Sequence, residues 1–199
     1  MERSTVRVFL NYRTDDEGST ALAVSRYLCE RIGEPNVFLD KRSIDPGTLF
    51  DDAILRNLWR SDVLVAIMGR DWLGFPGRAG GRAIDDPEDW VRRELVEALT
   101  HQVRIVPFLV GGAPRLVSDD LPPELVDLVR YQDVRFELRT PEAAFARLDR
   151  ILGLPDADEP ARGRGRSGGI GSVRGNRNIS ITDPRGAVTI GDPFPRNET

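Results

Sequence analysis

The sequence has few of the residues that form disulfide bonds or bind metal ions. Its 199 residues include one cysteine, Cys29, and one histidine, His101. A single cysteine excludes an internal disulfide framework, and a lone histidine outside any cluster of ligands predicts no metal site. We interpret Cys29 as a core residue and His101 as a structural residue at a helix end, where a cation is favoured.

Long hydrophobic runs and a strong excess of charge of one sign are also lacking. No apolar stretch approaches the roughly 18 residues of a membrane span, and the N-terminal residues show no signal-peptide cleavage pattern. The net charge of −4 gives no electrostatic reason to expect nucleic acid or an anionic membrane as a partner. These absences predict a cytoplasmic protein that neither spans a membrane nor binds nucleic acid.

Residues 5–153 alternate short apolar runs with amphipathic stretches. Strands are predicted at 6–10, 37–39, 63–68, 103–110 and within 129–138, and helices at 19–32, 49–59, 89–101, 121–128 and 141–152. Such alternation predicts a parallel α/β sheet of five strands with helices on both faces. In the first helix, we expect Leu22, Ala23, Tyr27 and Leu28 to share the buried face.

The composition changes after residue 153. Residues 154–169 are rich in proline, glycine, serine and charge, with almost nothing to bury, and are predicted to form a flexible linker. The stretch 163–168 matches a dinucleotide-binding Gly-x-Gly-x-x-Gly pattern, but it follows no strand and opens no helix, so we reject that interpretation. Residues 170–193 contain two alternating segments around the turn signal Asp183-Pro-Arg-Gly186. Two such short β segments need a partner surface or further copies of themselves to be stable.

Five motifs in residues 5–152 carry a family resemblance. Three of them end predicted strands, and the second of these leads into Ser43-Ile-Asp-Pro-Gly47; the other two open a helix and form the fourth strand. They are Phe9-Leu-Asn-Tyr-Arg13, Val37-Phe-Leu-Asp40, Ile67-Met-Gly-Arg-Asp-Trp72, Asp89-Trp-Val-Arg-Arg-Glu94 and Ile105-Val-Pro-Phe108. In this order and spacing they resemble the TIR domain family, particularly its bacterial members. The resemblance implies a flavodoxin-like parallel sheet. Asn11 departs from the family pattern, in which serine is usual, and its place beside the expected pocket suggests an effect on substrate handling.

The resemblance also implies a site and a reaction. Ligands of open α/β sheets bind beyond the carboxyl ends of the strands, where Tyr12, Arg13, Asp45, Trp90 and Glu94 are expected. TIR enzymes that consume NAD use a glutamate at the position of Glu94, which implies contact with the nicotinamide ribose and stabilisation of an oxocarbenium-like state. Arg13 is expected to hold the pyrophosphate, and Trp90 to stack on a planar ring. NAD+ is then the substrate, with no cofactor or metal, and the product is ADP-ribose or a cyclic form.

Each of these residues has a simpler structural interpretation. Glu94 is one of several carboxylates on its helix, and as an exposed, solvated carboxylate its replacement is expected to cost little stability. Arg13 is placed to pair with Asp15 or Asp16. Trp90 is a candidate core residue, and Asp45 a residue that only shapes a turn. Trp59 and Trp72 are interpreted as packing residues.

Two functions of different classes follow. The first is a TIR NAD+ hydrolase or cyclase that is activated by self-association in bacterial immune or cell-death signalling. The second is an adaptor that acts through TIR–TIR contacts without chemistry. The presence of a glutamate at the Trp90–Glu94 spacing favours the enzyme. Residues 170–193 resemble the amyloid signalling motifs of bacterial immune proteins, which are similar to RHIM motifs, and this resemblance implies an NLR-type sensor with a matching motif as a partner.

Overall fold

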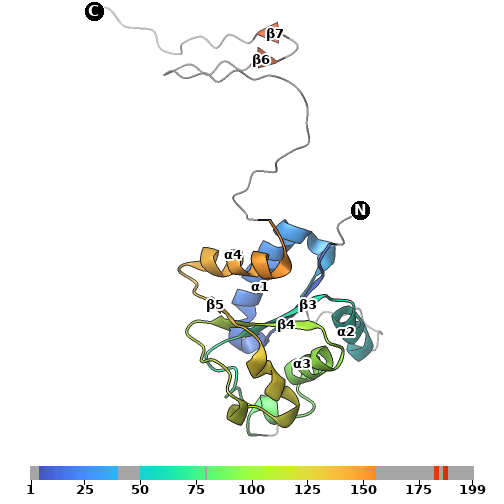
Figure 1. Ribbon diagram of the computed structural model, residues 1–199, viewed down its shortest axis with the longest axis vertical. Helices are drawn as coiled ribbons and strands as arrows, with labels where there is room; N and C mark the ends of the chain where they lie inside the picture. The colour runs from blue at the N-terminus through green and yellow to red at the C-terminus, as the bar shows by residue number, and fades with distance from the viewer. Residues whose placement is uncertain (1–4, 40–49, 79, 156–181, 184–185, 188–199) are drawn as a thin grey trace, which may run out of the picture. The chain divides into compact units, whose positions relative to one another are not determined.

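The computed structural model describes residues 5–39, 50–78 and 80–155, together with residues 182–183 and 186–187 (Figure 1). The predicted substrate contact Asp45, the loop Ser43–Gly47 and most of the predicted linker and tail lie outside these residues. In the described part of the chain, no helix is both long and apolar enough to cross a membrane.

Five strands form one parallel sheet in the order β2-β1-β3-β4-β5. The strands are β1 (Val8–Asn11), β2 (Val37–Leu39), β3 (Val63–Met68), β4 (Arg104–Val110) and β5 (Val134–Phe136). All six residues of β3 are buried, as expected of a central parallel strand covered on both faces. The predicted parallel α/β sheet of five strands is therefore confirmed, and β3 is its central strand.

Helices cover both faces of the sheet (Figure 1). Helices α1 (Thr14–Ile32) and α4 (Pro141–Leu152) share one apolar cluster with alternate strand residues such as Val8 and Leu10. Helices α2 (Phe50–Trp59) and α3 (Trp90–Thr100) share the opposite cluster, which includes Phe9. Because side chains alternate along a strand, Phe9 and Asn11 of β1 face α3 while Leu10 and Tyr12 face α1 and α4.

Helix α1 differs from the predicted helix in its start and in its buried face. It begins at Thr14, because Asp15, Asp16 and Glu17 in the first turn complement the positive end of the helix dipole, and it is kinked at Glu17 (φ −125°). The buried residues are Thr20, Ala21, Val24, Leu28 and Ile32. Leu22 is 50% exposed, so its predicted burial is wrong. Cys29 is partly exposed rather than in the core.

One further element and one side chain differ from the sequence prediction. The predicted helix 121–128 is a 3₁₀ helix, η4 (Pro123–Arg130), with two prolines at its start. Shorter 3₁₀ turns are η1 (Glu34–Asn36), η2 (Ala83–Asp85) and η3 (Ser118–Asp120). Trp72 is buried as predicted, whereas Trp59 is 46% exposed at the end of α2, where its ring contacts that of His101 at a tilt of 32°.

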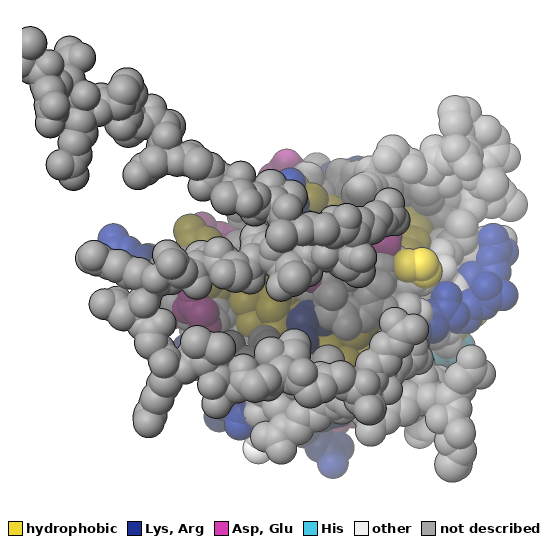
Figure 2. All heavy atoms as spheres, turned by 90° about the horizontal axis from the view of Figure 1, so that it is seen from above, with side chains coloured by type: hydrophobic (Ala, Val, Ile, Leu, Met, Phe, Trp, Pro, Cys, Tyr) yellow, Lys and Arg dark blue, Asp and Glu magenta, His cyan; other side chains and the backbone are white. Residues whose placement is uncertain are grey.

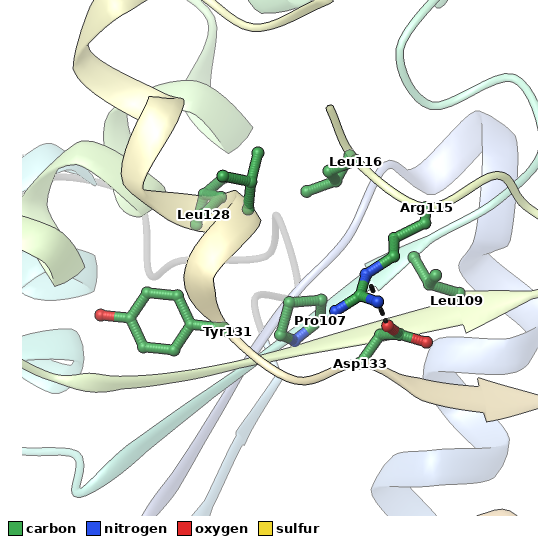
Figure 3. A pocket seen from close by; sticks show the side chains of 8 residues that line it. Pro107, Leu109, Arg115, Leu116, Leu128, Tyr131 and Asp133 are labelled. Atoms are coloured by element: carbon green, nitrogen blue, oxygen red, sulfur yellow. Dashed lines mark ion pairs between the residues drawn. The ribbon is translucent and has the colours of Figure 1, made fainter. Parts of the chain in front are cut away.

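A small cavity lies between η4 and strand β4. It is lined by apolar side chains such as Pro107, Leu116 and Leu128, and the Arg115–Asp133 ion pair (3.4 Å) closes one side (Figure 3). Its volume of about 10 Å³ is too small for an organic ligand. It is therefore a packing gap, and the candidate site lies elsewhere.

A separate pair of short strands falls within the predicted tail. Strands β6 (Thr182–Asp183) and β7 (Gly186–Ala187) are antiparallel, with Thr182 opposite Ala187 and Asp183 opposite Gly186. This pairing agrees with the turn predicted from Asp183-Pro-Arg-Gly186.

Candidate functional site

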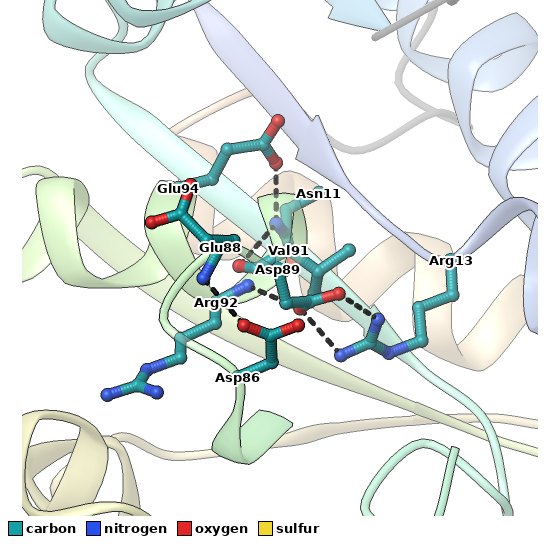
Figure 4. Close-up of polar contacts among 8 residues, drawn as sticks. All are labelled: Asn11, Arg13, Asp86, Glu88, Asp89, Val91, Arg92 and Glu94. Carbon is teal, nitrogen blue, oxygen red and sulfur yellow. Dashed lines mark hydrogen bonds and ion pairs between the residues drawn. The ribbon is translucent and has the colours of Figure 1, made fainter. Parts of the chain in front are cut away.

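The candidate site begins with a buried amide at the end of β1. Asn11 is fully buried, and its Nδ2 donates to Glu94 Oε2 at 2.6 Å and to the Val91 carbonyl at 3.2 Å (Figure 4). The end of β1 is thereby tied to the first turns of α3. Glu94 is 2% exposed, so the expectation of a solvated helical carboxylate is wrong. The burial arises because Glu94 lies on the face of α3 that packs against the sheet.

Arg13 forms a two-pronged ion pair with Asp89 at the start of α3. Its two terminal nitrogens donate to the two Asp89 carboxylate oxygens at 2.8 and 2.9 Å, and Arg13 is 5% exposed. The partner is therefore Asp89 rather than Asp15 or Asp16. The guanidinium carbon also lies 5.1 Å from the ring centre of Phe75 and 5.9 Å from that of Trp72, so it is held on several sides.

Asp89 has a second role as the N-cap of α3. One of its carboxylate oxygens accepts a hydrogen bond from the Arg92 backbone N–H at 3.0 Å. This satisfies one of the free backbone donors at the helix start. The same carboxylate therefore fixes both Arg13 and the origin of the helix that carries Glu94.

A hollow of about 400 Å³ opens beside this helix start. Its volume is in the range of small-molecule pockets. The hollow is lined by Arg13, Thr14, Asp15, Phe75, Pro76, Gly77, Arg78, Ala83, Asp86, Glu88, Asp89, Trp90 and Val91. Four carboxylates and two guanidinium groups make up its charged lining, so its charge favours a ligand with a cationic part. Glu94 is not among the lining residues; it lies one helical turn beyond Trp90.

Trp90 lies at the mouth of the hollow and is partly buried. The Arg93 guanidinium carbon lies 4.4 Å from the Trp90 ring centre, which is a cation–π distance. The Arg93 guanidinium thereby packs on the Trp90 indole.

The site thus brings together three of the five predicted residues: Arg13, Trp90 and Glu94. Tyr12 is partly buried against the apolar cluster under α1 and α4, on the other face of the sheet. Asp89 is a partner that the sequence prediction missed, whereas Asn11 was expected beside the pocket but not as the partner of Glu94. The alternation of side chains along β1 would have placed Asn11 towards α3, and the position of Asp89 just before the helix is a capping signal.

The end of β3 approaches the start of α1 closely. A Cβ atom on Gly69 would lie 2.6 and 2.7 Å from the two Asp16 carboxylate oxygens and 2.7 Å from a Glu17 carboxylate oxygen, so a larger residue there would force these two side chains to move. Burial raises the pKa of Asp16, and the Gly69 N–H opposes that rise by donating to the carboxylate. Among the described residues, no group of three or more histidine, cysteine, aspartate or glutamate side chains has the arrangement of a metal site.

Comparison with known proteins bears on both the fold and the family. The NAD(+) hydrolase sarm1 of Drosophila melanogaster is 25% identical over 150 residues, which cover 74% of this chain and 10% of the relative. The chain therefore spans about a tenth of the length of this curated relative.

Two solved structures are similar to the chain. The TIR domains of the activated Roq1 resistosome, which directly recognises the pathogen effector XopQ, superpose with a TM-score of 0.52 at 13% identity, covering 74% of this chain and 99% of that one. A metazoan TIR-STING receptor from C. gigas, in complex with 2′,3′-cGAMP, gives a TM-score of 0.46 at 18% identity, covering 77% and 40%. The first likeness supports the fold. Residues 8–149 match the TIR domain family, and the chain belongs to it.

Proposed function

We propose that this TIR domain cleaves the nicotinamide–ribose bond of NAD+, with Glu94 as the catalytic residue. The observation that carries the proposal is the Glu94 carboxylate, which the Asn11 amide holds at 2.6 Å, one helical turn from a residue that lines the hollow. The similarity to an NAD(+) hydrolase supports it.

The reaction requires little beyond stabilisation of positive charge. When the bond from the nicotinamide nitrogen to the ribose carbon breaks, the electron pair leaves with nicotinamide, which becomes neutral. The ribose becomes oxocarbenium-like, and the Glu94 carboxylate stabilises that charge and contacts the ribose hydroxyls. Water then adds to the ribose carbon and releases one proton, giving ADP-ribose; in cyclisation, an adenine nitrogen of the same molecule takes the place of water.

The lining of the hollow suits the cationic end of this substrate. The nicotinamide ring of NAD+ carries a positive charge, and the aromatic rings of Trp90 and Phe75 and the carboxylates of Asp86 and Glu88 attract such a ring. Arg13 also lines the hollow, and we propose that it contacts the pyrophosphate from its position between Asp89 and the ligand. Tyr12 and Asp45 are further proposed substrate contacts that rest on the family resemblance alone.

We further propose that self-association switches the enzyme on in bacterial immune or cell-death signalling. Contacts between TIR domains and stacking of residues 170–193 are the proposed means, with an NLR-type sensor carrying a matching motif as the trigger. High local concentration of tethered domains favours sites that need a neighbouring copy.

The proposal is tested by replacing one carboxylate. Glu94→Gln keeps the shape of the side chain but removes its charge, and it should lower NAD+ consumption by at least about 100-fold. Glu97→Gln is the matched control, because Glu97 lies on the same helix and accepts from Trp59 Nε1 at 3.1 Å on the surface. The measurement is chromatographic analysis of nicotinamide release by concentrated full-length protein. Wild-type turnover by the Glu94→Gln protein would contradict the assignment of Glu94 as the catalytic residue.

The burial of Glu94 favours a second candidate, an adaptor without chemistry. A carboxylate that is 2% exposed and hydrogen-bonded to Asn11 can be purely structural. This candidate predicts no nicotinamide release by the wild-type protein at any concentration, together with retained binding between copies of the chain. The same chromatographic assay, run beside light scattering, therefore distinguishes the two functions.

A further inference from the structure

The Asn11 side chain uses both of its amide hydrogens on helix α3. One goes to the Glu94 carboxylate at 2.6 Å and the other to the Val91 backbone carbonyl at 3.2 Å. The amide oxygen is buried and has no hydrogen-bond partner among the described residues, so these two donor contacts alone orient the side chain. The reversed amide would set its oxygen against both the carboxylate and the carbonyl oxygen, which excludes that orientation.

The two contacts define the position of Glu94 relative to the sheet. Val91 precedes Glu94 by three residues, so one donor holds the backbone of the helical turn and the other holds the side chain that projects from it. Asn11 itself is the last residue of β1, a strand paired on both sides. A rigid strand end therefore holds both the helical turn and the carboxylate that projects from it, which a side chain with one donor cannot do.

Resting on the proposed function, we propose that Asn11 is a positioning residue that holds the Glu94 carboxylate in its productive orientation. Asn11 does this by donating to Glu94 and Val91 together, and its replacement lowers the rate of bond cleavage more than the affinity for NAD+. Displacement of a reacting group by about 1 Å costs up to about 100-fold in rate, so the loss of both donors should be visible in kcat.

The hydrogen bond between Asn11 and Glu94 can be tested without any assay of activity, by exchanging which residue donates and which accepts. Asn11→Asp has the same shape as asparagine but places a second carboxylate against Glu94, and it should lower the melting temperature of the full-length protein by roughly 3 to 8 °C. Adding Glu94→Gln restores a donor–acceptor pair with the roles exchanged. The double variant should then melt well above Asn11→Asp alone. A double variant that melts no higher than Asn11→Asp overturns the pairing.

Steady-state kinetics test the positioning role itself. Asn11→Leu has a similar size and no donors, and it should lower kcat by about 10- to 100-fold while KM changes by less than about threefold. Tyr27→Phe is the matched control: it removes a hydrogen bond of equal length, 2.6 Å to Asp149, on the other face of the sheet. This control should lower the melting temperature and leave kcat unchanged.

The outcomes separate this proposal from the proposed function. Wild-type turnover with an unchanged kcat in Asn11→Leu overturns the positioning role and leaves the enzyme assignment standing. An equal loss of kcat in Asn11→Leu and Tyr27→Phe also overturns it, because the loss then follows stability. A wild-type protein that consumes no NAD+ overturns the enzyme assignment and the positioning role of Asn11 together, while the melting temperatures still decide whether Asn11 and Glu94 are paired.

Discussion

At the scale of single residues, the ion pair between Arg13 and Asp89 does two things at once. It neutralises a guanidinium that is 5% exposed, and it orients the carboxylate that caps α3. Burial of such a pair costs desolvation energy that only good geometry offsets. The two parallel hydrogen bonds supply that geometry, so the loss of one partner leaves the other charge buried without compensation.

Removal of Arg13 should therefore destabilise the protein strongly. We expect Arg13→Ala to lower the free energy of unfolding by about 2 to 4 kcal/mol, as measured by urea denaturation. The control is Arg82→Ala, because Arg82 pairs with Asp85 in the same two-pronged way at 2.7 Å but the two side chains are 37% and 48% exposed. That surface pair should contribute less than about 1 kcal/mol. Equal losses in the two variants would contradict the importance of burial.

The site could be predicted from the sequence only where its residues follow one another along the chain. The spacing of Trp90 and Glu94 is local, and the structure sets them one turn apart on α3. The pairs Asn11–Glu94 and Arg13–Asp89 join residues 83 and 76 positions apart, and local patterns carry no signal for such contacts. The burial of Glu94 is a different case, because Val91, Leu95 and Ala98 are buried on the same face of α3 and their helical spacing is a local signal.

At the scale of whole elements, a polar joint connects helices α1 and α4. Tyr27 of α1 donates to the fully buried Asp149 of α4 at 2.6 Å, and Arg31 pairs with the same carboxylate at 3.1 Å. The Tyr27 ring also stacks on Phe145 at 4.0 Å. Arg31 reaches beyond α4 to the carbonyl of Pro155, so the joint holds the residues that follow the helix as well.

This joint predicts a pH dependence with a definite sign. Burial, followed by the hydrogen bond and the charge of Asp149, raises the pKa of Tyr27 above its ordinary value of 10.0. The folded protein then keeps the proton that the unfolded chain releases near pH 10, so the stabilisation is complete below pH 10 and is lost as the pH rises further. Tyr27→Phe should cost about 1 to 3 kcal/mol at pH 7.

Urea denaturation of both proteins between pH 7 and pH 11 checks this expectation. The difference in unfolding free energy between wild type and Tyr27→Phe should shrink above pH 10. In that range the unfolded wild-type chain gains stability by releasing the Tyr27 proton, which the variant lacks. A difference that stays constant across that range would show that the Tyr27 hydroxyl is not coupled to folding.

The elements themselves were predicted unevenly from the sequence. Buried strands such as β3 and β4 were found because their apolar runs are continuous and short. The start of α1 was placed five residues too late, because the acidic first turn was not used as a helix signal. The misplaced buried face of α1, with Leu22 exposed, shows that a few apolar residues on a mostly polar helix do not fix its rotation.

At the scale of the whole molecule, charges of the two signs nearly balance, with 28 lysine and arginine residues against 32 aspartate and glutamate residues. The chain has a net charge of −4, and arginine side chains stand at the outline of the face shown in Figure 2. Such a surface supplies no general attraction for polyanions. The proposed contacts between copies of the chain rest instead on particular segments, among them residues 170–193.

The last prediction concerns these tail residues. The antiparallel pairing of β6 with β7 agrees with the predicted turn, and the flanking sequence alternates isoleucine and valine with polar residues. Segments of this kind can stack in register, because each backbone amide then pairs with the chains above and below. A peptide spanning residues 172–193 should therefore form fibrils with cross-β diffraction near 4.7 Å.

In the full-length chain, the same stacking should raise NAD+ turnover per molecule as the protein concentration increases, because assembled tails hold the TIR domains at high effective concentration. Ile181→Asp or Ile190→Asp places a charge in the stacked segment and should remove both the fibrils and the concentration dependence, while the melting temperature of the α/β domain stays the same. Thr189→Ser is a mild control in the same segment. A monomeric peptide at high concentration, together with unchanged turnover in the isoleucine variants, would leave the tail without a part in activation.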